Sequence, residues 1–413
     1  MDVNRRQFLT YLGAGTAALA SLATGIPALA AGPLSGKTAD HLFGLDAKKT
    51  NFNPKFTPIE PTTKDDVVLP SGYSYDVIAS YGDKINPAGD TYDYLNADGD
   101  DNKRTPDQIQ KYLYALGGSI IEIKKENGKW KLVSDSEYGR RVSGLTKHVL
   151  TGPAASIAKE VTGTFANCSG GVTLWNTVLS CEENYLDVVG DCKLPDDRHY
   201  GWVVEVDPFD PKSTPKKHTA LGRFSHENTA MVLASTGQLV VYMGDDAKDQ
   251  YVYKYVSKGK YDPKAGKANS RLLEEGTLYV ANFGKGKWIS LDLATNEALQ
   301  KAVKADGKPL FATQADVLIN CRDAAKAVSA TPMDRPEDLE VHPIDGSVFI
   351  ALTNNDKHGN FYGQIVRLFE KDNQHAGLEF SFEIFAAGGP QSGFSAPDNI
   401  TIRLPKTYVH NIH

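Results

Sequence analysis

The sequence predicts an all-β protein of the propeller class, and three observations lead to this prediction. Short β-type runs recur between turns rich in Gly, Asn and Asp, whereas helical periodicity is scarce. The 413 residues include 37 Gly, 21 Pro and 19 Tyr, a composition that favours turns and strands over helical bundles. An internal repeat also has the form of one antiparallel hairpin per unit, which is typical of propeller blades.

The first 30 residues are expected to be an export signal that is removed from the mature protein. Arg5 and Arg6 form a twin-arginine pair before a modestly apolar stretch, and Ala28 and Ala30 form a small-x-small cleavage signal. A membrane anchor is the less favoured alternative, because Gly, Ser and Thr interrupt the apolar stretch. We therefore expect recognition by the twin-arginine export machinery and a periplasmic or secreted monomer without stable membrane association.

Residues 31–70 are polar and rich in Pro and Thr, and they are expected to wrap the surface without a core of their own. The propeller domain is expected over 71–413, with insertions on its surface and short helices at 106–113 and 296–303. The expected strands cover residues 75–80, 119–124, 131–133, 172–180, 201–206, 239–243, 251–256, 276–282, 348–352 and 364–369.

Two segments, 227–246 and 337–355, carry the same repeat. Each has an acidic residue, a strand, a turn with glycine, a second strand and then a pair of carboxylates or amides. The turn glycine precedes this pair by the same number of residues in both copies. A weaker third copy ends with residues 172–184, and a fourth begins at residue 397. The repeat therefore favours propeller blades over a β-sandwich.

The residues that flank the repeated strands are candidate metal ligands. Both ends of a hairpin lie at one end of its sheet, so these residues should gather at one mouth of a central channel. They are Cys181, Glu182, Glu183, Glu227, Asp245, Asp246, Glu337, Asn354 and Asp398. So many carboxylates cannot stay ionised in a narrow funnel without cations. Any one of them alone is better explained as a solvated turn residue, but the matched set is not.

The ligand types indicate which metals to expect. Carboxylate and amide oxygens suit hard cations and above all calcium, whereas the thiolate of Cys181 indicates an iron-type or other transition ion beside the calcium. No His or Cys spacing typical of a zinc site occurs. Cys168, Cys192 and Cys321 could form a disulfide in an oxidising compartment, and the sequence assigns no pairing.

Arg335, Arg223 and His226 are the candidate catalytic residues, because they stand beside the expected ligands. A planar guanidinium can grip two phosphate oxygens, and metal ions polarise a phosphoryl group, so phosphoryl transfer with a metal-activated oxygen as nucleophile is expected. The alternative for Arg335 is a buried ion pair with Glu337 or Asp334. The alternative for His226 is a structural role beside the metal ligands.

Charge and motifs exclude several other classes of protein. The 45 Lys and Arg against 51 Asp and Glu, a net charge of −6, leave no basic surplus for binding nucleic acid. No P-loop, dinucleotide-binding fingerprint or Gly-x-Ser-x-Gly motif occurs, so NTPases, dehydrogenases and serine hydrolases have no support.

From about residue 70 to residue 399 the chain resembles the PhoX-type alkaline phosphatases, a family exported by the twin-arginine route. The segments that carry the resemblance are 70–78 (PSGYSYDVI), 175–184 (WNTVLSCEEN), 201–211 (GWVVEVDPFDP), 222–227 (GRFSHE), 242–246 (YMGDD), 253–256 (YKYV), 276–281 (GTLYVA), 330–337 (ATPMDRPE) and 353–355 (TNN).

The resemblance implies a six-bladed β-propeller phosphomonoesterase with Fe(3+) and Ca(2+) at the channel mouth. On the matching positions, Cys181 is implied as the thiolate ligand of iron and Arg335 as the residue that holds the phosphate. The other implied metal ligands include Glu182, Glu227, Glu337 and Asp398.

Two features depart from the family pattern. The chain ends shortly after Asp398, where the fourth repeat copy begins, and Pro405 stands where its second strand is expected. We therefore expect a C-terminally truncated or frame-shifted member with an incomplete last blade and an exposed edge strand. Asp338 also stands where the family pattern has a bulkier residue.

The leading hypothesis is an exported, metal-dependent phosphomonoesterase that releases phosphate from organic phosphate esters. A phosphodiesterase or nucleotidase on the same cluster is a neighbouring alternative. The alternative from another class is a catalytically inactive, calcium-binding propeller that binds a ligand or partner. A calcium-dependent lactonase is less favoured, because Cys181 and the arginines would then have no role.

Overall fold

The computed structural model describes residues 59–60, 62–80, 82–87 and 104–402. The expected export signal, most of the expected surface wrap and residues 403–413 lie outside the described residues. The larger of two compact units includes described residues 104–118 and 141–402, and the smaller includes 119–140 and the described residues up to 87. Across these described ranges, no helix combines the length and apolar character needed to span a membrane.

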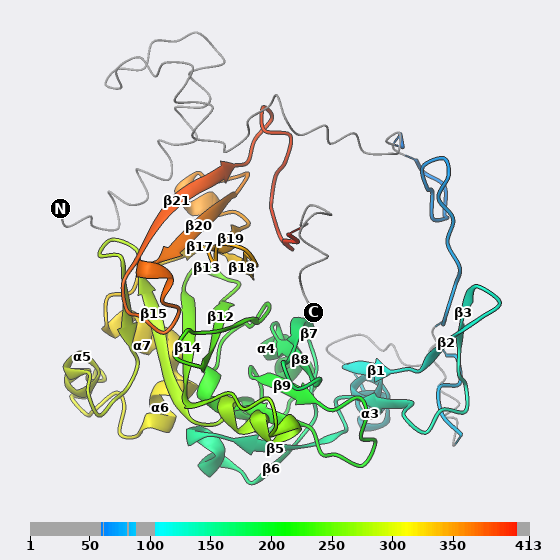
Figure 1. Ribbon diagram of the computed structural model, residues 1–413. Helices are drawn as coiled ribbons and strands as arrows, with labels where there is room; N and C mark the ends of the chain where they lie inside the picture. The colour runs from blue at the N-terminus through cyan, green and yellow to red at the C-terminus, as the bar shows by residue number, and fades with distance from the viewer. Residues whose placement is uncertain (1–58, 61, 81, 88–103, 403–413) are drawn as a thin grey trace. The chain divides into compact units, whose positions relative to one another are not determined.

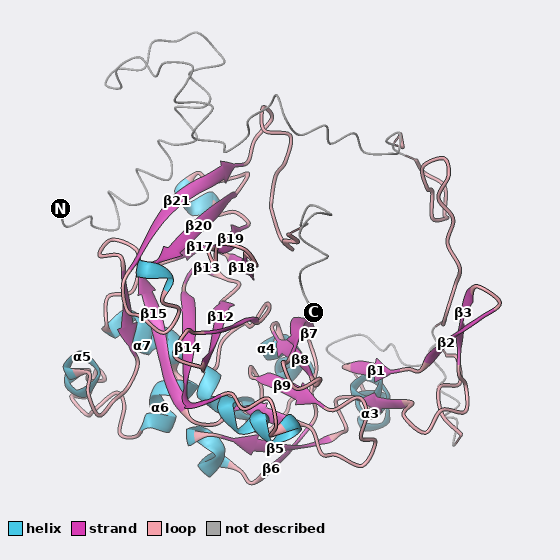
Figure 2. Cartoon of the chain, viewed as in Figure 1, coloured by secondary structure: helices cyan, strands magenta, loops and turns pink. Residues whose placement is uncertain are grey.

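Strands dominate the larger unit, and most of them belong to three sheets (Figures 1 and 2). The first sheet has the order β6-β5-β10-β9-β8-β7, the second β11-β12-β14-β15-β16 and the third β18-β19-β20-β21. All neighbours are antiparallel except β5 and β10, which are parallel. Runs of antiparallel neighbours are what a blade requires.

The strands of these sheets have the following bounds: β5 Lys147–Thr151, β6 Glu160–Thr162, β7 Asn167–Val172, β8 Val178–Glu182, β9 Val203–Val206, β10 Lys216–His218, β11 Ala230–Leu233, β12 Gln238–Gly244, β14 Val252–Lys260, β15 Gly276–Asn282, β16 Lys287–Ser290, β18 Pro336–Val341, β19 Val348–Leu352, β20 Gln364–Glu370 and β21 Phe380–Ala387. The shorter strands are β1 Gly118–Ile120, β2 Ile123–Glu126, β3 Lys129–Leu132, β4 Arg140–Val142, β13 Lys248–Gln250 and β17 Met333–Asp334.

Helices are short and lie between the strands. The α-helices are α3 Pro106–Ala115, α4 Tyr185–Asp191, α5 Glu297–Lys301, α6 Gln314–Ile319 and α7 Cys321–Ala327. The 3-10 turns are η2 Pro153–Ile157, η3 Asp197–His199, η4 Thr219–Leu221, η5 Gly266–Leu273, η6 Asp356–His358 and η7 Lys371–Asn373.

One edge strand of each sheet faces a common channel. β7, β11 and β18 are these edge strands, and β11 contacts both β7 and β18. All three contribute residues to one cavity of about 500 Å³. Sheets whose first strands surround a channel are blades, so the prediction of an all-β, propeller-like fold is confirmed. The count of six blades stays a prediction, and the completeness of the last blade depends on residues outside those described.

Strand β12 is buried on both faces, which explains its nearly continuous apolar run. In β12, Leu239, Val241 and Met243 pack into one core, whereas Val240 and Tyr242 pack into another. All five side chains are fully buried. Successive side chains of a strand point to opposite faces, so one strand serves both of the cores that flank its sheet.

Most expected elements are present, but three of the expected strands were wrong, and one of these, 119–124, is divided between β1 and β2. The expected strands 276–282 and 348–352 match β15 and β19 at both ends, and the expected helix at 106–113 matches α3, which begins with a capping box from Thr105. Residues 75–80 are not a strand. The expected strand 172–180 is instead the tip of the β7–β8 hairpin, where Asn176 adopts a left-handed φ of 60°.

Candidate metal centre

The repeat copies bring their flanking acidic residues to one point in space. Oxygen atoms of Glu227, Glu337 and Asp398 all lie within 4.8 Å of one another. Ligand atoms of Cys168, Glu183 and Glu227 also lie within 4.8 Å of one another. Because Glu227 belongs to both groups, the five side chains form one cluster, which we call the carboxylate cluster. Cys168, Glu227 and Glu337 precede or begin the inner strands and Glu183 follows β8, as the hairpin geometry requires, whereas Asp398 lies on the irregular segment after β21.

Arg335 and Asp246 border the carboxylate cluster. The Arg335 guanidinium lies 2.7 Å from Asp246 Oδ2 and 2.9 Å from Glu337 Oε1. Asp246 also lies near Glu183 and raises the pKa of that carboxyl. Within residues 104–402, no other lysine or arginine forms an ion pair with these carboxylates. One guanidinium therefore faces five carboxylates, and the site carries excess negative charge.

The electrostatics of the cluster oppose its full ionisation. The pKa of Glu337 is raised to about 8, mainly by burial and also by the charges of Asp246 and Asp398, while Thr353 and Arg335 act in the opposite direction. Burial and the neighbouring Asp246 and Glu227 raise the pKa of Glu183 to about 7. The pKa of Glu227 is also raised, first by burial. Carboxyls with such values hold protons near neutral pH unless cations replace them.

Thr353 links two parts of the cluster. Its hydroxyl lies 2.6 Å from Glu337 Oε1 and 2.7 Å from the Pro397 carbonyl oxygen, next to Asp398. A hydroxyl has one proton to donate, so it cannot donate to both acceptors at once. A protonated Glu337 would donate to Thr353 and satisfy both contacts, which agrees with the raised pKa of this carboxyl.

The two cysteines near the cluster are neighbours across a β-bulge. β7 and β8 pair Asn167 with Glu182 and Gly170 with Ser180, so Cys168 and Ser169 both stand opposite Cys181. The Cys168 thiol lies 3.1 Å from Glu227 Oε1. Burial raises the pKa of both thiols, and the nearby Cys168 and Glu227 raise that of Cys181 further. All four cysteines are free.

Sequence reasoning did not place Cys168 in the site. A signal was present, because Cys168 lies at the start of its hairpin, as Glu227 and Glu337 do in theirs. Thr353 was missed as well, and its position directly after β19 was the available clue.

The site contains two pairs of adjacent acidic residues, Glu182–Glu183 and Asp245–Asp246, and the two members of each pair have different surroundings. Glu182 is fully buried and binds Lys217, which is also fully buried, at 2.7 Å and the Gly201 and Trp202 amides at 2.9 and 3.1 Å. Asp245 receives two hydrogen bonds from Arg322, at 2.6 and 2.9 Å. The second residue of each pair, Glu183 or Asp246, instead faces the cluster. Successive residues of an extended segment point in opposite directions, so only one of each pair can face the channel mouth.

Arg223, His226 and Asn354 are the remaining residues that the sequence predicted for the site. Arg223 donates to the Tyr200 carbonyl at 2.8 Å and pairs with Asp197 at 2.7 Å. His226 donates from Nε2 to the Gly222 carbonyl at 2.8 Å, and burial lowers its pKa to about 3. Asn354 is half-buried and lies two residues after the end of β19. The structure does not bring Arg223 or His226 into hydrogen-bond contact with the cluster, so their catalytic roles stay predictions.

The chemistry of the donor set fits metal ions. Carboxylate oxygens converge with a thiol in a partly buried site, and Asp246 Oδ1 is buried without a hydrogen-bond partner among the described residues. Such oxygens and thiolates are ligands for hard cations and for iron-type ions respectively. Cations would relieve the repulsion that raises the carboxyl pKa values.

Comparison with known proteins identifies the family. The family model for alkaline phosphatase PhoX matches residues 93–404. The solved structure of Pseudomonas fluorescens PhoX in complex with vanadate, a transition state analogue, is similar with a TM-score of 0.72 and 32% identity, over 84% of this chain and 81% of that chain. No curated protein sequence matches the chain. Together with the acidic site at the channel mouth, these similarities show that the chain belongs to the PhoX alkaline phosphatase family and is a phosphoric monoester hydrolase.

Proposed function

We propose that the chain is an exported, metal-dependent phosphomonoesterase in which Arg335 holds the phosphate group of the substrate. The observation that carries the proposal is the position of Arg335 at the edge of the carboxylate cluster, with 29% of its side chain exposed. A phosphate ester is a dianion, so it needs positive charge in a site that otherwise carries only carboxylates. Arg335 and bound metal ions together would supply that charge.

The proposed metal ligands are the residues that converge on one point. They are Cys168, Cys181, Glu183, Glu227, Asp246, Glu337 and Asp398. We assign Fe(3+) to the part with the thiols and Ca(2+) to the part with oxygens alone, because ligand softness separates these ions. When bound, the metal ions polarise the phosphoryl group and stabilise charge on the attacking and leaving oxygens. Glu182 and Asp245 are not in this set, because Lys217 and Arg322 already bind them.

Arg335 is oriented before substrate arrives. Asp246 and Glu337 hold one side of its guanidinium, at 2.7 and 2.9 Å, and the backbone of Arg335 has a left-handed φ of 56°. A guanidinium has five N–H donors, so some remain for phosphate oxygens. An arginine that is already fixed loses little conformational entropy when it binds the phosphate.

The sequence supports the proposed export route and location. The twin-arginine pair at Arg5 and Arg6 supports passage through the twin-arginine machinery, and the mature protein would act in the periplasm or outside the cell. In that setting its substrates would be small organic phosphate esters.

The test uses the mature chain from Ala31. Bound iron and calcium are measured by elemental analysis, and hydrolysis of a chromogenic phosphomonoester is measured with and without a chelator. Iron, calcium and chelator-sensitive turnover are expected together. Metal without turnover would instead support the inactive, calcium-binding propeller, and turnover that a chelator leaves unchanged would contradict metal dependence.

Cysteine variants test the assignment of iron. Cys168→Ser and Cys181→Ser should each lower the iron content and leave calcium largely in place, because serine is a poor substitute for a thiolate. Cys192→Ser is the matched control, since Cys192 is a free, buried cysteine at the end of α4 and outside the cluster. Equal iron in all three variants would contradict the assignment.

A further inference from the structure

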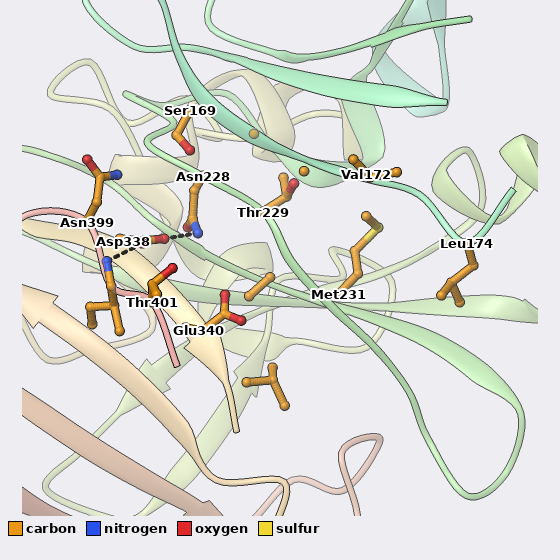
Figure 3. Close-up of a pocket in the computed structure, with 15 residues that line it drawn as sticks. Ser169, Val172, Leu174, Asn228, Thr229, Met231, Asp338, Glu340, Asn399 and Thr401 are labelled. Atoms are coloured by element: carbon orange, nitrogen blue, oxygen red, sulfur yellow. Dashed lines mark hydrogen bonds between the residues drawn. The ribbon is translucent and has the colours of Figure 1, made fainter. Parts of the chain in front are cut away.

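We infer that Asp338 is a positioning residue that fixes the spacing of the metal ligands Glu227, Glu337 and Asp398. The inference rests on the proposed metal-dependent function, but it concerns a residue outside the ligand set. Asp338 follows Glu337 in β18 and is 5% exposed. It lies in the wall of the channel cavity, together with Asn228 and Asn399, which directly follow Glu227 and Asp398 (Figure 3).

The two oxygens of Asp338 bind two different segments. Oδ1 accepts a hydrogen bond from Asn228 Nδ2, and Oδ2 accepts one from the Ile400 amide at 2.6 Å. Asn228 follows Glu227, and Ile400 lies two residues after Asp398. Asp338 itself follows Glu337, so one carboxylate joins the three chain segments that supply one group of converging ligand atoms.

Asn228 strengthens the first of these links. Its Oδ1 accepts from the Leu339 amide at 3.1 Å, and its Nδ2 donates to the Leu339 carbonyl at 2.8 Å. The Asn228 side chain therefore binds both the backbone of β18 and the side chain of Asp338. This arrangement fixes the start of β11 against β18, and with it the distance between Glu227 and Glu337.

The second link matters because Asp398 lies on an irregular segment. No strand of the described residues includes 397–402, so no ladder of backbone hydrogen bonds holds Asp398. The Thr353 hydroxyl contacts the Pro397 carbonyl before Asp398, and Asp338 binds the Ile400 amide after it. Asp398 is thus held from both sides by residues that neighbour Glu337 in sequence or in space.

Asp338 acts through its hydrogen bonds and not only through its charge. A second carboxylate, Glu340, lies two residues further along β18 and lines the same cavity. Glu340 adds a similar negative charge to the channel but lies further from the ligand residues along the strand. Glu340→Gln is therefore a matched control for Asp338→Asn, since each variant removes one charge from the same wall.

Asp338→Asn keeps the shape of the side chain but offers an oxygen to only one of the two donors. The other donor then faces the amide N–H₂ group, and one of the two links is broken. Changes to groups that orient metal ligands typically lower metal affinity by about 10- to 100-fold. We expect Asp338→Asn to release metal at an at least tenfold lower chelator concentration, whereas Glu340→Gln should differ from the unchanged protein by less than about twofold.

Two further readouts separate positioning from a general loss of structure. With saturating metal, kcat of Asp338→Asn should recover to within about threefold, because Asp338 does not touch the substrate. Hydrogen exchange of residues 398–402 should be faster in Asp338→Asn than in Glu340→Gln. If the two variants match in both metal release and exchange, the inference is overturned.

The experiment distinguishes this inference from the proposed function. An unchanged protein that holds no metal would overturn the metal-dependent function, and the exchange data would still show whether Asp338 anchors residues 398–402. If Asp338→Asn does not fold, exchange is measured on the unchanged protein with and without metal. Metal should then slow exchange at Leu339 and Ile400, and equal exchange in the two samples would overturn the inference.

Discussion

Raising the pH from 6.5 to 8 should destabilise the metal-free protein, because the carboxylate cluster then loses its protons inside the fold. Glu337 has a pKa raised from 4.5 to about 8, mainly by burial, and its side chain is only 4% exposed. Glu183 has a pKa raised to about 7, also mainly by burial. In the unfolded chain both groups have already lost their protons at pH 6.5. The folded state binds more protons than the unfolded state in this window, so stability falls as pH rises.

The magnitude follows from these pKa values. Each pKa unit corresponds to about 1.36 kcal/mol, and between pH 6.5 and 8 the Glu337 contribution is about 1.6 kcal/mol. Glu183 adds about 0.8 kcal/mol, so the two carboxyls together lower the free energy of unfolding by about 2.4 kcal/mol over this window. The buried histidines His148 and His226, whose pKa values are lowered to about 3, oppose this fall by about 0.4 kcal/mol each, because their imidazoles are still half protonated at pH 6.5 in the unfolded chain. Lys254, with a pKa lowered to about 8, opposes it by a similar amount as the pH approaches 8. The net fall in the free energy of unfolding should therefore be about 1 kcal/mol.

The assay is urea unfolding of chelator-treated protein at pH 6.5 and 8, followed by intrinsic fluorescence. Glu337→Gln is the control, because its amide cannot ionise, and it should lose more than half of the pH dependence. Metal-loaded protein should show no such loss, since metal ions bind the ionised carboxylates. A metal-free protein whose stability is constant or rises over this window would refute the reasoning.

Three other substitutions give further tests. Arg335→Lys keeps the charge but loses the planar fork, so kcat/KM for a phosphomonoester should fall at least tenfold while chelator resistance changes little; an unchanged kcat/KM would argue against phosphate binding by Arg335. Lys217→Met leaves Glu182 buried without its partner, and thermal and urea unfolding should report a loss of about 3–5 kcal/mol; an unchanged urea midpoint would contradict this. Thr353→Val removes the hydroxyl beside Glu337 at similar side-chain volume, and it should lower the unfolding free energy by about 1–3 kcal/mol and ease metal release, as chelator titration would show.

The hairpin repeat made much of the site predictable. Strand alternation and turn residues fix where each hairpin begins and ends, and both ends lie at one end of a sheet. The repeat therefore predicted that Glu227, Glu337 and Asp398 would meet, and their oxygens do lie within 4.8 Å of one another. The same pattern predicted the neighbourhood of Glu183 and Asp246, but it could not choose between each of them and the acidic residue before it.

That choice depended on partners far away in the sequence. Glu182 binds Lys217, 35 residues later, and Asp245 binds Arg322, 77 residues later. Neither basic residue belongs to the repeat, so local pattern gave no sign of these pairs. A buried carboxylate that binds a basic side chain is already satisfied, so the remaining carboxylate of each pair is the one proposed to bind a metal ion.

The sequence alone determined the all-β, propeller-like architecture, the acidic mouth of the channel and the resemblance to the PhoX family. These features depend on local periodicity, on turn chemistry and on motifs that lie along the chain. The tertiary structure decided that Cys168 joins the cluster. It also decided that Asp338 binds both Asn228, which lies 110 residues earlier in the chain, and the Ile400 amide after Asp398. Such contacts depend on how blades from distant parts of the chain pack against one another, and no local pattern encodes that packing.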